Sequence, residues 1–145
     1  MKAEELMIGD LVLYQDEAIR VEHIYNNGYG VVVGEKTYED LDYLSVGYNT
    51  RIVDITIDEV FPIPLTAEIL EANEFLLDHG FYTIKNVIGA KTMVRYTEQD
   101  EEHCHPHFLG HWVLDESYIV DNVHELQHAL RLCGLSDEAN NFKIE

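Results

Sequence analysis

The chain has 145 residues, 46% of them apolar, and its 28 acidic and nine basic side chains give a formal net charge of −19. This length allows one domain or two very small ones, and the apolar content excludes a globally disordered chain. Direct nucleic-acid binding is disfavoured, because phosphate backbones are bound by clustered Lys and Arg and no such cluster is present. The acidity favours a basic protein partner or, if carboxylates line one face, mimicry of a nucleic acid.

The sequence predicts no membrane span, secretory signal or disulfide framework. No run of about 18 apolar residues predicts a membrane span. The opening stretch, residues 1–5, lacks the basic and apolar regions of a secretory signal. Cys104 and Cys133 are too few for a disulfide framework. We therefore expect a cytoplasmic protein in a reducing environment, without membrane contact.

The first half of the chain is predicted to be all-β. Residues 6–14 are predicted to open with a turn at Gly9-Asp10 and then form a strand. Short runs rich in β-branched and aromatic residues predict further strands over 18–25, 29–33 and 51–57, with a weaker strand or loop over 37–46. The stretch 26–28, Asn-Asn-Gly, predicts a hairpin turn. Strands at this spacing suggest a small closed β-barrel. The opening 8–12, Ile-Gly-Asp-Leu-Val, resembles small barrels of the Src-homology-3-like kind, which commonly serve as binding platforms.

The second half of the chain is predicted to contain both helices and strands. Pro62 and Pro64 hold the backbone extended, and Thr66 is a good N-cap for a helix over 67–78 that Gly80 would end. Strands are then predicted over 81–87, 91–97 and 108–114, followed by a helix over 123–133 that is capped by Asp121 or Asn122 and ended by Gly134. The expected class is α+β: a β-barrel module, 1–62, and an α+β module, 63–145, with a helix, a short antiparallel sheet and a closing helix.

The closing helix contains the one motif with a known chemistry. His124-Glu125-Leu126-Gln127-His128 matches the zinc-peptidase pattern His-Glu-x-x-His. Histidines four residues apart share a helix face and could hold one zinc ion, while Glu125 would act as general base on the bound water. The longer metzincin form is excluded, because Arg131 and Gly134 stand where it needs Gly and His. The candidates for a third ligand are Asp137, Glu138 and Glu145.

The helix wheel opposes the zinc interpretation. At about 100° per residue, one apolar stripe contains Val123, Leu126, Ala129, Leu130 and Cys133. His124 and His128 lie on the opposite side, so we expect them to be largely exposed while the stripe is buried. A peptidase helix must instead lie between the two walls of a cleft. The wheel therefore favours a surface helix without metal.

Two longer stretches resemble a group of uncharacterised proteins from prophages and mobile elements of gut anaerobes. They are 62–73, Pro-Ile-Pro-Leu-Thr-x-Glu-Ile-Leu-x-x-Asn, and 123–127, Val-His-Glu-Leu-Gln. Members share a small β region, this helix, a short sheet and a closing helix, and the resemblance covers most of the chain. It implies no activity, substrate or cofactor. Members often have Asn-Gly-Phe where this chain has Asn73-Glu74-Phe75, which leaves the end of the first helix open.

A second group of histidines is a weaker metal candidate. On an extended chain His103, His105 and His107 face one side, with His111 nearby, and imidazoles suit zinc, nickel or copper. Pro106 interrupts a regular strand, and no zinc signature is complete. We interpret the stretch as a polar loop in which zinc or nickel capture would be adventitious, and we expect no functional cofactor.

Three functions remain as hypotheses. The leading one is a non-enzymatic accessory protein that binds another protein. The alternatives are a zinc-dependent hydrolase that uses the His-Glu-x-x-His helix and an acidic nucleic-acid mimic that inhibits a DNA-binding protein. We further expect the negative field to raise the pKa of His103 and His124, so that the protein gains stability between pH 8 and about 6.

Overall fold

The computed structural model describes residues 5–25, 31–33, 36–38, 43–48, 51–78, 80–84, 92–95, 106–115 and 118–144. The first half contains β1 (Leu11–Tyr14), β2 (Glu17–Tyr25), β3 (Val31–Val33), β4 (Lys36–Tyr38), β5 (Tyr43–Tyr48), β6 (Arg51–Thr56), the 3-10 turn η2 (Ile57–Glu59) and β7 (Val60–Phe61). The second half contains α1 (Ala67–Ala72), β8 (Phe75–Asp78), β9 (Phe81–Ile84), β10 (Thr92–Arg95), η4 (Pro106–Phe108), β11 (Trp112–Leu114), β12 (Tyr118–Ile119), α2 (Val123–Leu132) and α3 (Ser136–Asn140).

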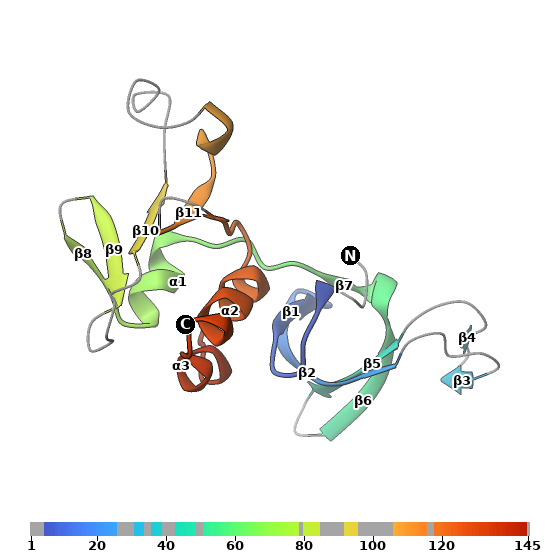
Figure 1. Cartoon of the computed structure of the whole chain (residues 1–145). Helices are drawn as coiled ribbons and strands as arrows, with labels where there is room; N and C mark the ends of the chain where they lie inside the picture. The colour runs from blue at the N-terminus through green and yellow to red at the C-terminus, as the bar shows by residue number, and fades with distance from the viewer. Residues whose placement is uncertain are drawn as a thin grey trace.

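Two antiparallel five-stranded sheets organise this α+β chain, in the orders β6-β5-β2-β1-β7 and β12-β11-β10-β9-β8. In Figure 1 the first sheet lies on the right and the second on the left, with α2 and α3 between them. None of the helices in the described ranges is long and apolar enough to cross a membrane.

The predicted closed barrel is wrong. In the described part of the first sheet β6 and β7 are opposite edges, so the sheet stays open. η2 follows β6 directly and turns the chain, and β7 has only two residues, which pair with β1. β3 and β4 form a separate two-stranded ladder and do not extend the sheet. The predicted turn at 26–28 lies outside the described residues.

The first helix is much shorter than predicted. Thr66 is its N-cap, and its hydroxyl accepts a hydrogen bond from the Ile69 N–H at 3.2 Å. The helix ends at Ala72, and β8 takes the place of its predicted second half. Asn73 causes this end: its side-chain amide donates to Ile69 O at 2.8 Å and to Lys143 O at 2.6 Å. Gly80 lies in the turn between β8 and β9 and does not end the helix.

Among the described residues, the buried side chains form two clusters. The first sheet encloses one, around Val12, Val21, Leu44 and Val46. The other joins α1, the second sheet, α2 and α3, and it includes Leu11 of β1. The division of the chain at residues 62 and 63 stays a prediction.

Helix α2 buries most of the predicted apolar stripe, but it does not expose the two histidines as predicted. Val123, Leu126 and Leu130 are buried, and Ala129 is partly buried. Cys133 is exposed, so its predicted burial is wrong. The expected exposure of the histidines is also wrong: His124 is 5% exposed, and the His128 side chain is 25% exposed. Both are covered because the loop before β1 packs against the polar side of α2.

Candidate functional site

A fully buried carboxylate holds α2 against the loop before β1. Asp10 has no exposed surface. Its Oδ2 accepts a hydrogen bond from the Met7 N–H at 2.7 Å and lies 2.5 Å from His128 Nε2, while its Oδ1 accepts from the Arg131 guanidinium at 2.6 Å. A buried carboxylate needs a cationic partner, here Arg131, together with hydrogen bonds, to offset its lost hydration. From the sequence Asp10 was expected only in a turn, and its role in anchoring α2 was not predicted.

Gln127, at the fourth position of the motif, is also fully buried. Its Oε1 accepts a hydrogen bond from the Leu11 N–H at 2.9 Å, and its Nε2 donates to the carbonyls of Gly9 at 3.1 Å and Ala139 at 2.9 Å. One side chain thus connects β1, the loop before it and α3. Gly9 also allows the close approach of Arg131: its φ is +94°, and a Cβ there would lie 3.0 Å from an Arg131 guanidinium nitrogen.

The two motif histidines lie beside a cavity of about 470 Å³. Its lining consists of Glu5, Pro62, Asn122, His124, Glu125 and His128. The imidazole centroids of the two histidines are 5.8 Å apart, in an edge-to-face arrangement. Nδ1 of His124 is buried and has no hydrogen-bond partner among the residues that the structure describes. The structure therefore brings both histidines and Glu125 together, as the motif requires.

The donor chemistry of this cavity fits zinc poorly. His128 directs Nε2 at Asp10, and Glu125 accepts a hydrogen bond from the Asn122 side-chain amide at 2.6 Å, at the start of the helix. Zinc bound at Nε2 of His124 would require the proton on Nδ1, which would then be a buried donor without an acceptor. Among the residues that the structure describes, no three His, Cys, Asp or Glu side chains form a group that could hold a metal ion. The zinc site stays a prediction.

The second histidine group lies mostly outside the described ranges. His103 and His105 fall there, as does Cys104. His107 is exposed in η4, where its ring centroid lies 4.2 Å from that of Phe108. His111 pairs through Nδ1 with Asp121. The predicted metal capture by His103, His105 and His107 is untested.

The burial of His124 implies that stability depends on pH in the opposite sense to the one expected from the net charge. Burial lowers the pKa of His124 below its usual 6.5, although Glu125, Asp10 and Glu5 raise it in part and the nearby His128 lowers it. Below about pH 6.5 the unfolded chain takes up a proton that the folded chain resists, so stability is present above that pH and is lost on acidification. The expectation of a raised pKa at His124 is wrong, and His103 lies outside the described residues.

The measurement is the free energy of unfolding, from denaturant melts between pH 8 and 5, for the wild type and His124→Gln. We expect the wild type to lose more stability than the variant on going from pH 7 to 5. Because both proteins share the other titrating groups, their difference isolates His124. Parallel curves for the two proteins would contradict the assignment.

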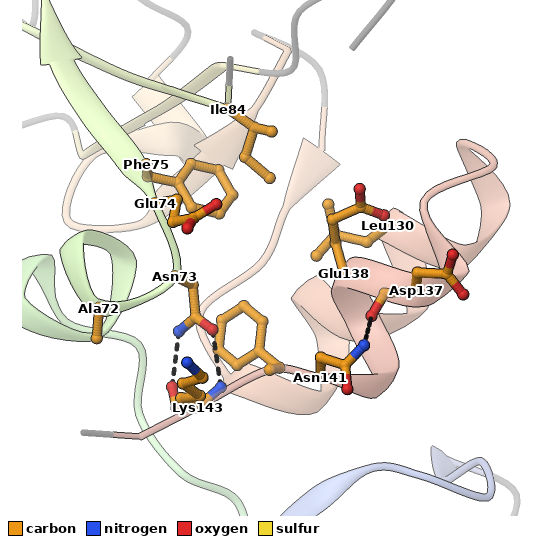
Figure 2. Close-up of a pocket in the computed structure, with 11 residues that line it drawn as sticks. Ala72, Asn73, Glu74, Phe75, Ile84, Leu130, Asp137, Glu138, Asn141 and Lys143 are labelled. Atoms are coloured by element: carbon orange, nitrogen blue, oxygen red, sulfur yellow. Dashed lines mark hydrogen bonds between the residues drawn. The ribbon is translucent and has the colours of Figure 1, made fainter. Parts of the chain in front are cut away.

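A second concave site has a different character. It is a groove of about 260 Å³, between the end of α1, the start of β8 and the C-terminal helices. Its floor is apolar and buried, and is formed by Phe75, Ile84, Leu130 and Phe142. Its rim carries the exposed side chains of Glu74, Asp137, Glu138, Asn141 and Lys143. We call this site the acidic groove. Figure 2 shows Glu74 and Phe75 on one side of it and Leu130 and Glu138 on the other, with the Asp137 carboxylate directed away from Glu74.

Local features of the chain shape the acidic groove. Asn73 accepts a hydrogen bond from the Lys143 N–H at 2.7 Å and donates to Lys143 O, which fixes the end of the chain against α1 (Figure 2). Glu74 has a φ of +67°, in the left-handed region that disfavours side chains. This conformation places an acidic side chain at the entrance, beside Phe75. Sequence reasoning missed the groove, since its walls come from segments far apart in the chain; the departure at Asn73-Glu74 was the only local signal.

Comparisons with known proteins place no further constraint on the site. No protein-family model matches the sequence, and no curated protein or solved structure matches it either.

Proposed function

We propose that this chain is a non-enzymatic accessory protein, of phage or mobile-element origin, that binds a basic segment of another protein in the acidic groove. The observation that carries the proposal is the combination of a buried apolar floor with exposed carboxylates on the rim. The origin rests on the resemblance of the two sequence stretches alone.

The groove suits an apolar anchor flanked by Lys or Arg. Interfaces gain most of their affinity from a few apolar or aromatic side chains that fill pockets, while charges at the rim select the partner and speed its approach. Glu74, Asp137 and Glu138 supply that charge, and Lys143 offsets only part of it. The net charge of −19 attracts a basic partner over a longer range and repels acidic ones.

The placement of the His-Glu-x-x-His residues supports a non-enzymatic role. His128 is bonded to Asp10, Gln127 to the loop before β1 and α3, and Glu125 to Asn122. These side chains hold α2 in place. The polar contacts of these three side chains are thus structural, whereas Nδ1 of His124 has no partner among the described residues.

The test is selection from a displayed library of random short peptides on the immobilised wild-type protein. We expect enrichment of peptides in which Lys or Arg flank an apolar residue, with affinity that weakens as salt is raised. The groove variant Glu74→Lys with Glu138→Lys should weaken binding by about tenfold or more, because it replaces attraction by repulsion.

The matched control is Glu17→Lys with Asp58→Lys. Both residues are exposed in the N-terminal half, and the change in net charge is the same. This control should retain binding apart from a small general loss from the altered field. Equal losses in the two variants, or no enrichment on the wild type, would overturn the proposal.

Glu74→Gly separates binding from stability. Glycine adopts positive φ without strain, so the variant should be as stable as the wild type or up to about 1 kcal/mol more stable. The loss of one rim carboxylate should nevertheless weaken peptide binding. Calorimetric melting and peptide titration measure the two effects, and destabilisation by more than about 1 kcal/mol would show that the Glu74 side chain supports the fold.

A further inference from the structure

We infer that the basic partner segment binds as an additional β-strand along the free edge of β8, with one of its side chains in the acidic groove. The inference rests on the proposed function, since it specifies how the same partner is held. β8 is the terminal strand of the second sheet, and within the described ranges it pairs only with β9. Figure 1 shows it at the outer edge of the molecule.

The exposed side chains of β8 support strand addition. Leu76 is 48% exposed and Leu77 is 58% exposed. Consecutive side chains of a strand point to opposite faces, so a neighbouring strand would contact both leucines. Proteins usually protect an edge strand by short length, charged residues, Pro or a bulge. β8, Phe-Leu-Leu-Asp, is short and ends in Asp, but it contains neither Lys nor Pro, and its two central residues are exposed leucines.

The edge and the acidic groove are continuous. Phe75 is both the first residue of β8 and part of the groove floor, and Glu74 on the rim directly precedes it. A segment that pairs with β8 would therefore reach the groove with a side chain at its end. Backbone hydrogen bonds would supply affinity along the strand, and the groove would supply the side-chain preference.

The charges favour a basic partner over a second copy of this chain. A second copy would bring another net charge of −19 against a rim that already carries Glu74, Asp137 and Glu138. Like charges across an interface oppose association, whereas Lys and Arg side chains beside an extended segment would be attracted.

The test uses peptides enriched on the wild-type protein, resynthesised with a single backbone N-methyl group at each successive residue. In an added strand only alternate residues bond to the neighbouring strand. We therefore expect binding to weaken by about tenfold at alternate positions and to change little at those between, which is the effect of losing one hydrogen bond. Amide hydrogen exchange in β8 should slow when the peptide binds.

Side-chain variants provide a second readout. Leu76→Thr with Leu77→Thr keeps the β propensity but removes apolar contact, and should weaken peptide binding. Ile52→Thr, on the exposed edge strand β6, is the matched control and should leave binding unchanged.

The outcomes separate the two proposals. If N-methylation has no alternating effect and β8 exchange is unchanged, while the Glu74 and Glu138 variant still loses binding, the strand addition is wrong and the groove function stands. If no peptide is enriched on the wild type, both are wrong. An alternating pattern together with slowed exchange in β8 supports the added strand.

Discussion

Replacing Asp10 by Ala should cost about 3–5 kcal/mol of the free energy of unfolding, the cost typical of removing one partner from a buried ion pair. Asp10 is fully buried between His128 and Arg131, and it also accepts the Met7 N–H. Without it, Arg131 would keep a buried positive charge with no counter-ion at that contact. Denaturant melts at pH 7 measure the effect.

Asp16→Asn is the control for this change. Asp16 is exposed and has a φ of +63°, a conformation that Asn tolerates as well as Asp does. The control removes the same charge and should alter stability by no more than about 0.5 kcal/mol. If Asp10→Ala costs as little as the control, the buried cluster around Asp10 does not hold α2 in place.

Replacing Leu126 or Leu130 by Ala should cost about 2–5 kcal/mol each, because both changes leave a cavity in a packed core. Both side chains are buried on α2, in the cluster that joins the second sheet to α3. Equilibrium melts in urea test each variant, with the midpoint and slope fitted separately.

Leu132→Ala on the same helix is the matched control. Leu132 is 90% exposed, and its truncation should change stability by less than about 0.5 kcal/mol. A cost below about 0.5 kcal/mol for both core variants would mean that α2 does not pack by this face.

The sequence alone predicted the elements that depend on neighbouring residues. Thr66 starts α1 where expected, and Gly134, with a φ of +80°, follows the end of α2. The buried side of α2 at Val123, Leu126 and Leu130 follows from a helical period of 3.6 residues. These features are predictable because caps and periodicity act within one or two turns of the chain.

Contacts between residues far apart in the chain determine the features that were wrongly predicted or missed from the sequence. The apolar spacing over 67–78 is compatible with one long helix, but Asn73 bonds to Lys143, 70 positions away, and the chain continues as β8. The wheel of α2 placed His124 and His128 in solvent, but the loop around Asp10, 118 positions from His128, covers them. The acidic groove likewise exists only where the end of α1 meets the C-terminal helices. Local patterns indicate which face of a helix or strand is apolar. Only the tertiary structure shows which other segments pack against that element and which polar groups those segments place beside it.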